Sequence, residues 1–324
     1  MSVTDAANDS PLQSIAFILT GVFVFSLQDV LVKWISDRYP VHEIIFIRSV
    51  SALLPMLLLV RLEGGWQRIQ TRRPVLHSVR ALLMFLSYIS FYLSLAALPL
   101  AEAVTLFFAS PLFITILSAP MLGDRVSFST WLPVLLGFSG VALMLQPGLQ
   151  VVNPAAFLPL ISALLYAVVS IITRQLGKAD SGICLAFYPT VLYILFATLL
   201  SLTAGGRLGD GDAHPSLAFL LRSWQMPSHT DLLLMMSTGL IAAGGFYCLS
   251  QAYRLSRPSF VAPFEYTAVP ISCFWGYLLW QEVLNPLSVS GILLIIGSGL
   301  YLFAPRRLFA NKYLLGLFKT KVRK

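Results

Sequence analysis

Ten long apolar runs follow one another along the chain, and this succession restricts the fold more than any other feature of the sequence. Because about 20 helical residues cross the hydrocarbon core of a bilayer, each run predicts one transmembrane helix. The runs lack the alternation of apolar and polar residues that marks the strands of an outer-membrane barrel. We therefore expect an all-α integral membrane protein with helices near residues 15–34, 43–60, 75–98, 101–122, 131–145, 156–172, 182–203, 232–253, 259–280 and 287–303.

The composition agrees with a membrane protein. Of the 324 residues, 57% are hydrophobic and 11% are charged, whereas a soluble domain carries about 25% charged residues. The three cysteines, Cys184, Cys248 and Cys273, are isolated within apolar runs and are interpreted as small core residues. We therefore predict neither a metal site nor a cofactor.

One stretch of the chain occurs twice. Residues 101–125 read AEAVTLFFASPLFITILSAPMLGDR, and residues 258–282 read PSFVAPFEYTAVPISCFWGYLLWQE. Each copy has two internal prolines, an acidic residue near its end and a following apolar run with closely spaced glycines. These parallels predict two five-helix repeats, residues 12–147 and 154–305. Since five is odd, the second repeat enters the membrane from the opposite side, and such inverted repeats are typical of secondary transporters.

Lysine and arginine gather on one side of this predicted topology. The outer loops hold only Arg38, Arg207 and Arg222, while the inner loops and the segment 306–324 hold the other basic residues outside the runs. By the positive-inside rule, the N-terminal segment 1–11 and the basic tail 306–324 both face the cytoplasm. We expect this tail to rest on anionic lipid, so the net charge of +8 does not indicate a nucleic-acid partner.

Ionisable residues inside the apolar runs are the sharpest signal of a site, because each costs about 2.5 to 3.5 kcal/mol to insert unless it is paired or hydrated. Asp29 and Arg48 lie at matching depths near the outer side, and we predict an intramembrane ion pair between them. Arg80 and Glu265 match in depth near the inner side. Either a structural ion pair or a contact that exchanges with substrate or a proton fits each couple.

Aromatic and polar residues near these charges form the candidate translocation site. Rings on the third, fourth, eighth and ninth runs could stack on a ligand, although packing is the commoner use of such rings. Pro111 and Pro270 are predicted helix breaks that free backbone carbonyls. The candidate substrate-binding residues are Glu265, Arg80, Tyr88, Phe107, Phe108, Tyr247, Gln251, Phe264 and Tyr266.

Five motifs resemble a known family. QDVLVKW, RSVSALLP, RALLMFLSYISFY, SPLFITIL and APFEYTAVPISCFWGYLLWQE are similar to segments of the EamA-type branch of the drug/metabolite transporter superfamily, over about residues 12 to 305. The resemblance implies ten helices in two inverted repeats, a cavity lined by the third, fourth, eighth and ninth helices, and alternating access without ATP. It also implies a multi-pass protein of the bacterial inner membrane with a small-molecule substrate.

Within that branch, the chain looks most like riboflavin and S-adenosylmethionine importers. A flat isoalloxazine ring suits the aromatic set, whereas a cationic S-adenosylmethionine would use Asp29 and Glu265. Sister groups that export amino acids or metabolites remain an alternative, and proton coupling through Glu265 is a hypothesis. A membrane enzyme is disfavoured because HExxH, GxSxG and Walker motifs are absent, and a sensor because no long loop could hold a signalling domain.

Overall fold

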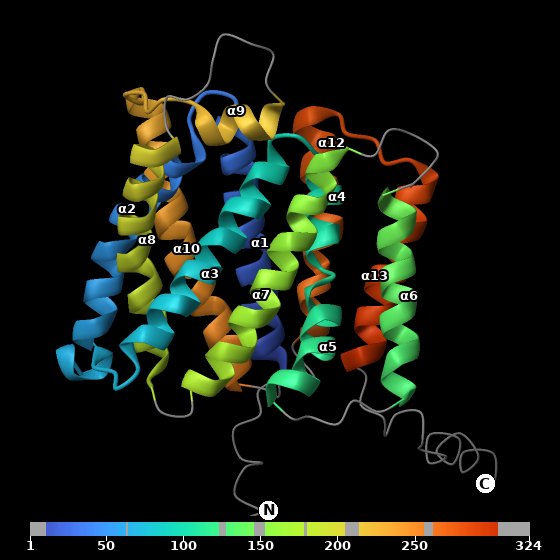
Figure 1. Cartoon of the computed structure of the whole chain (residues 1–324), viewed down its shortest axis with the longest axis horizontal. Helices are drawn as coiled ribbons and strands as arrows, with labels where there is room; N and C mark the ends of the chain where they lie inside the picture. Colours follow the sequence, from blue (N-terminus) through green and yellow to red (C-terminus); the bar gives the residue numbers. More distant parts are fainter. Residues whose placement is uncertain are drawn as a thin grey trace, which may run out of the picture.

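The computed structural model describes residues 11–62, 64–122, 128–145, 153–177, 180–204, 214–255 and 262–303. All of the regular structure in these residues is helical (Figure 1). The α-helices are α1 (Pro11–Ile35), α2 (Val41–Leu62), α3 (Pro74–Leu95), α4 (Leu100–Phe107), α5 (Ser110–Leu122), α6 (Phe128–Leu145), α7 (Phe157–Leu176), α8 (Gly182–Ala204), α9 (Pro215–Leu221), α10 (His229–Leu255), α12 (Ala268–Trp280) and α13 (Pro286–Phe303). Short 3₁₀ helices are η2 (Trp66–Ile69), η3 (Pro154–Ala156) and η4 (Ala262–Thr267).

Seven segments of the described chain are long and apolar enough to cross a bilayer, and the helices around Trp131–Met144 and Pro286–Tyr301 are shorter but apolar. Large apolar side chains also cover the outside: Leu54 is 77% exposed and Leu293 is 66% exposed. Such a surface is unfavourable in water and favourable in lipid. The prediction of an all-helical membrane protein is therefore confirmed.

Two of the predicted spans are interrupted. α4 ends at Phe107 and α5 begins at Ser110, directly before Pro111. Proline has no N–H and cannot donate to the carbonyl four residues earlier, which favours a break at this point. In the second half, the 3₁₀ helix η4 ends at Thr267, and Pro270 lies in the first turn of α12.

The helices pack in pairs that join distant parts of the chain. α1 packs along α10, α3 along α7, α6 along α13, and α2 against both α8 and α10 (Figure 1). α4 packs against α12, α5 against α7, and η4 against α1. The largest fully buried side chain of the described residues, Tyr92, lies in α3 and belongs to the main apolar core.

The α6–α13 pair is a close crossing that depends on glycine. A Cβ atom on Gly140 would lie 2.8 Å from the Gly291 carbonyl oxygen, and one on Gly291 would lie 2.7 Å from the Gly140 carbonyl oxygen. The two backbones approach this closely because neither residue has a side chain, as is common where membrane helices meet.

Figure 1 also defines the two ends of the molecule. α9 and the first turn of α4 lie at its upper end, whereas α3 and α8 begin at its lower end. The first turn of α1 and the last turn of α13 also lie toward the lower end. Contacts that join the two halves are found at both ends and are described below.

Candidate functional site

A cavity of about 510 Å³ lies between helices of the two halves, a volume typical of small-molecule sites. Its walls come from α2, α3, α8 and α10, with Thr173 contributed by α7. Most of the lining is apolar, and no carboxylate is found among the described residues that line it. The polar and aromatic members of the wall are Arg48, Ser49, Arg80, Tyr88, Thr173, Thr190, Tyr193 and Tyr247.

Arg48 is one of two buried cations in the cavity wall, with only 5% of its surface exposed. Its Nη1 donates to the Tyr92 hydroxyl oxygen at 3.0 Å, and its guanidinium lies 4.7 Å from the centroid of the Tyr88 ring. The Tyr92 oxygen also accepts a hydrogen bond from Gln28 Nε2 at 2.8 Å. The Tyr92 hydroxyl and the Tyr88 ring therefore contact this guanidinium, and Gln28 in turn bonds to Tyr92.

The predicted ion pair between Asp29 and Arg48 is not a direct contact. Asp29 lies within electrostatic range of Arg48, but none of the ion pairs formed by the described residues joins the two. Instead, the Tyr92 hydroxyl accepts a hydrogen bond from Arg48 Nη1, and the Tyr88 ring lies against the guanidinium.

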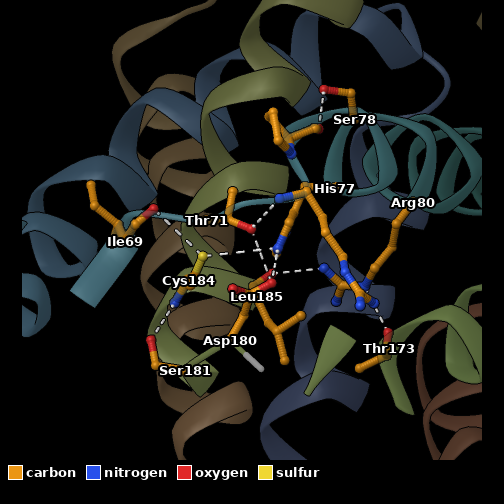
Figure 2. A network of polar contacts seen from close by, with 12 residues as sticks. Ile69, Thr71, His77, Ser78, Arg80, Thr173, Asp180, Ser181, Cys184 and Leu185 are labelled. Atoms are coloured by element: carbon orange, nitrogen blue, oxygen red, sulfur yellow. Dashed lines mark hydrogen bonds and ion pairs between the residues drawn. The ribbon is translucent and has the colours of Figure 1, made fainter. Parts of the chain in front are cut away.

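Arg80 is the second buried cation, with 6% of its surface exposed. Its Nε donates to Thr173 Oγ1 at 2.6 Å, and its Nη1 donates to the Leu185 carbonyl at 2.9 Å (Figure 2). Thr173 in turn donates to the Val169 carbonyl at 2.7 Å. A first-half arginine is thus held by α7 and α8 of the second half, and its positive charge stays in the cavity wall.

Tyrosine rings complete the same wall. The Tyr88 ring packs edge-on against Tyr92 and Tyr193, with centroids 5.7 and 5.9 Å apart. The hydroxyl of Tyr193 is buried and has no hydrogen-bond partner among the described residues. An unpaired buried hydroxyl is unfavourable, so its position in a cavity wall is consistent with bonding to a bound molecule or to water.

Three of the nine candidate substrate residues line this cavity: Arg80, Tyr88 and Tyr247. Phe108 instead packs against Tyr266 with centroids 5.0 Å apart, and Phe107 packs against Tyr166 at 5.4 Å. These contacts fill the space near α4 and η4. We expected the fourth and ninth apolar runs to line the cavity. In the structure the second and seventh runs, which form α2 and α8, line it instead.

The remaining candidates lie elsewhere. Phe264 packs on a small cluster that contains Ile18 and Val22. Glu265 is partly buried in η4, and Pro111 and Pro270 lie at the helix interruptions already described. The side chain of Gln251 lies outside the described residues. Sequence reasoning missed Tyr193 and Thr173; the signal for Tyr193 is a hydroxyl in the middle of an otherwise apolar run.

Ion pairs join the two halves at the upper end. Lys33 Nζ lies 3.1 Å from Glu282 Oε1, and Glu282 Oε2 accepts a hydrogen bond from the Leu100 amide at 2.8 Å. A second bridge joins Arg38 to Asp231 at 3.5 Å, and the Tyr39 hydroxyl donates to the same carboxylate at 2.7 Å. These contacts hold α1 against segments of the second half.

Comparison with known proteins gives the chain a context. A family model described as the EamA-like transporter family matches residues 12–146 and again residues 153–304. The chain is 25% identical over 306 residues to an S-adenosylmethionine uptake transporter of Rickettsia prowazekii, covering 93% of this chain and 96% of the relative. It is 27% identical over 280 residues to a riboflavin transporter of Vibrio cholerae, covering 84% and 87% of the two chains.

Two further matches are an exporter and a solved structure. A pseudopaline exporter of Pseudomonas aeruginosa is 28% identical over 275 residues, covering 85% of this chain and 90% of the relative. A crystal structure superposes with a TM-score of 0.60 at 16% identity, covering 90% of this chain and 98% of the other. At that identity the structural likeness shows the fold alone.

Proposed function

The chain belongs to the EamA-like transporter family, and from this premise we propose that it is a secondary transporter that takes up riboflavin across the bacterial inner membrane by alternating access. The observation that carries the proposal is the cavity between the halves, with two buried arginines, tyrosine rings and no carboxylate among the described residues of its lining.

This lining suits a flat molecule that is rich in hydrogen-bond acceptors. The carbonyl oxygens of an isoalloxazine ring accept hydrogen bonds from guanidinium groups, and its plane packs on tyrosine faces. The Tyr193 hydroxyl, which has no partner among the described residues, and the Thr190 oxygen in the same wall would bond to a polar group such as the ribityl chain. Binding of a neutral ring avoids the large desolvation cost of burying a further ion beside the two arginines.

The ten-helix inverted repeat is part of this proposal. The family model matches two successive stretches, and exchanging the halves maps the helix contacts onto one another. α1 on α10 corresponds to α7 on α3, and α2 on α10 corresponds to α8 on α3. Three further contacts join equivalent helices of the two halves, so the exchange leaves them unchanged: α2 with α8, α4 with α12, and α6 with α13. The repeats would occupy residues 12–147 and 154–305.

The proposed orientation places the lower end of Figure 1 in the cytoplasm, in agreement with the concentration of Arg61, Arg68, Arg72 and Arg73 around the α2–α3 connection. Substrate enters when the Lys33–Glu282 and Arg38–Asp231 pairs at the upper end separate, and it leaves when the contacts at the lower end separate. Each state then exposes the cavity to one side of the membrane.

S-adenosylmethionine uptake is the second candidate, favoured by the relative that carries this name and aligns with 93% of the chain. The two buried arginines weigh against it, because a sulfonium ligand would meet positive charge in the wall. Export remains a third outcome, since one relative is named an exporter.

The test is uptake of labelled riboflavin by a riboflavin-auxotrophic bacterium that expresses the chain, compared with an empty vector. We expect uptake from the wild type, a large loss in Arg48→Gln, and normal uptake in Arg61→Gln, which changes an exposed arginine on the same helix. If the wild type is present in the membrane and takes up no riboflavin, the assignment fails, and labelled S-adenosylmethionine uptake and amino-acid efflux are measured in the same cells.

A further inference from the structure

A second polar cluster lies where α3 and α8 begin, at the lower end of the molecule (Figure 1), and Figure 2 shows it beside Arg80 of the cavity wall. His77 Nε2 is 2.9 Å from Asp180 Oδ2, and Cys184 Sγ is 3.9 Å from the same His77 nitrogen. The imidazole nitrogen, the carboxylate oxygen and the sulfur all lie within 4.8 Å of one another. Three chemically different ligand groups thus converge on one point.

The fold brings this cluster together from both halves. His77 lies in the first turn of α3, Asp180 precedes α8, and Cys184 lies in the first turn of α8. Ser181 Oγ donates to the Arg68 carbonyl at 2.7 Å and accepts from the Cys184 amide at 3.2 Å. These bonds attach the start of α8 to the α2–α3 connection, so contacts between the two segments fix the position of the cluster.

The three side chains are almost fully enclosed. His77 and Cys184 have no exposed surface, and the Asp180 side chain is 8% exposed. Thr71 Oγ1 donates to Asp180 Oδ2 at 3.0 Å and so orients the carboxylate toward the histidine (Figure 2). The His77 and Thr71 contacts thus hold the Asp180 carboxylate beside the Cys184 sulfur, so the three ligand atoms are already arranged around one point.

We propose that His77, Asp180 and Cys184 form a binding site for a thiophilic divalent metal ion, with Zn²⁺ as the ion that the ligand set fits best. Metal bonds of about 2.0 to 2.3 Å to nitrogen, oxygen and sulfur in a tetrahedron place the ligand atoms about 3.4 to 3.6 Å apart. The His77–Asp180 and Cys184–His77 separations, 2.9 and 3.9 Å, bracket these values. Small rotations of the side chains complete the geometry.

The chemistry of the ligands selects the class of ion. A thiolate and an imidazole favour zinc and similar transition metals, whereas Ca²⁺ and Mg²⁺ require oxygen ligands. Binding releases the proton of the Cys184 thiol to solvent, and the cation offsets the repulsion between thiolate and carboxylate. The fourth position is open to water or to the Ile69 carbonyl, which lies 3.5 Å from the sulfur.

One neighbouring charge opposes the ion. The guanidinium of Arg80 lies within electrostatic range of Cys184, as Figure 2 illustrates. Two anionic ligands and one nearby cation leave a net negative site, so binding is favoured but is weaker than at a site with no neighbouring cation.

A metal ion at this position ties the α2–α3 connection to the start of α8. On the proposed transport function, these segments belong to opposite repeats and must separate when the cytoplasmic end opens. Zinc therefore inhibits transport by holding that end closed, which makes the cluster a regulatory site that adjoins the substrate cavity through Arg80 and the first turn of α8.

The binding test uses the purified full-length chain in detergent and Co²⁺ as a spectroscopic substitute for zinc. We expect a thiolate-to-cobalt charge-transfer band and visible tetrahedral d–d bands, both removed by equimolar Zn²⁺. Cys184→Ser abolishes the charge-transfer band, and Asp180→Asn lowers the cobalt affinity by about tenfold or more. Cys273→Ser in α12 is the matched control and keeps the full signal.

Two results would overturn the site: no charge-transfer band in folded wild-type protein, or an unchanged band in Cys184→Ser. Size-exclusion profiles confirm that each variant is folded, and Asp180→Asn supplies an isosteric second variant. Inhibition of uptake by Zn²⁺ in the wild type, but not in Cys184→Ser, tests the regulatory role. If the protein binds cobalt but transports nothing, the proposed function is contradicted while the proposal of a metal site is still supported.

Discussion

Lys33 and Glu282 lie 3.1 Å apart although 249 positions separate them in the chain, and their contact joins α1 to the segment that precedes α13. Both side chains are mostly buried, and Lys33 also donates to the Leu95 and Leu98 carbonyls and lies 5.3 Å from the centroid of the Trp280 ring. This bond is a bridge between the two halves at the upper end.

A double-mutant cycle on this pair is the first prediction. Glu282→Gln leaves the Lys33 ammonium without its carboxylate, and Lys33→Met leaves Glu282 without its cation, so each single variant unfolds at a lower temperature than the wild type. The double variant loses less than the sum of the two, with a coupling free energy of about 1 to 3 kcal/mol. Thermal unfolding in one detergent measures all four proteins, and strict additivity would show that the contact contributes nothing.

The variant Tyr193→Phe tests whether the Tyr193 hydroxyl stabilises the fold or binds the substrate. The Tyr193 hydroxyl has no partner among the described residues, so its removal leaves stability unchanged or raises it by about 1 kcal/mol. If the hydroxyl contacts substrate, KM for uptake rises about tenfold while the amount of folded protein in the membrane stays the same. An unchanged KM would remove Tyr193 from the substrate site. Tyr301→Phe, on an exposed face of α13, is the control.

Glu265→Gln tests proton coupling. The variant keeps the size and polarity of the side chain in η4 but cannot exchange a proton, so concentrative uptake is lost while the protein remains folded and inserted. Uptake driven by an imposed pH gradient in proteoliposomes, compared with uptake down a substrate gradient alone, measures the effect. Normal concentrative uptake by the variant would exclude Glu265 as the proton carrier.

Gly140→Ala tests the close crossing of α6 and α13. A methyl group there lies 2.8 Å from the Gly291 carbonyl oxygen, so the helices must separate, at a cost of about 1 to 3 kcal/mol. We expect a lower unfolding temperature. Gly297→Ala is the matched control, because a Cβ there meets no atom of the described residues within 4 Å. Equal effects in the two variants would mean that helix propensity, and not the crossing, determines the result.

The sequence alone determined the helical membrane fold, the family and part of the site. Runs of uncharged residues can satisfy their backbone hydrogen bonds in lipid only as helices or closed barrels, which makes length and polarity sufficient to predict the class. Arg80 was found because an ionisable group is expensive inside a bilayer and therefore stands out, and Tyr88 and Tyr247 because aromatic rings near such charges can stack on a ligand.

Only the tertiary structure decided which helix faces meet. Core-facing and lipid-facing sides of these helices are both apolar, so the sequence carries little information about their rotation. The rotation of α2 places Arg48 against Tyr88 and Tyr92 without a direct bond to Asp29, and the packing of α3 beside α8 brings His77 to Cys184 across 107 positions. Contacts between side chains so far apart in the chain depend on the packing of whole helices, and no local pattern encodes them.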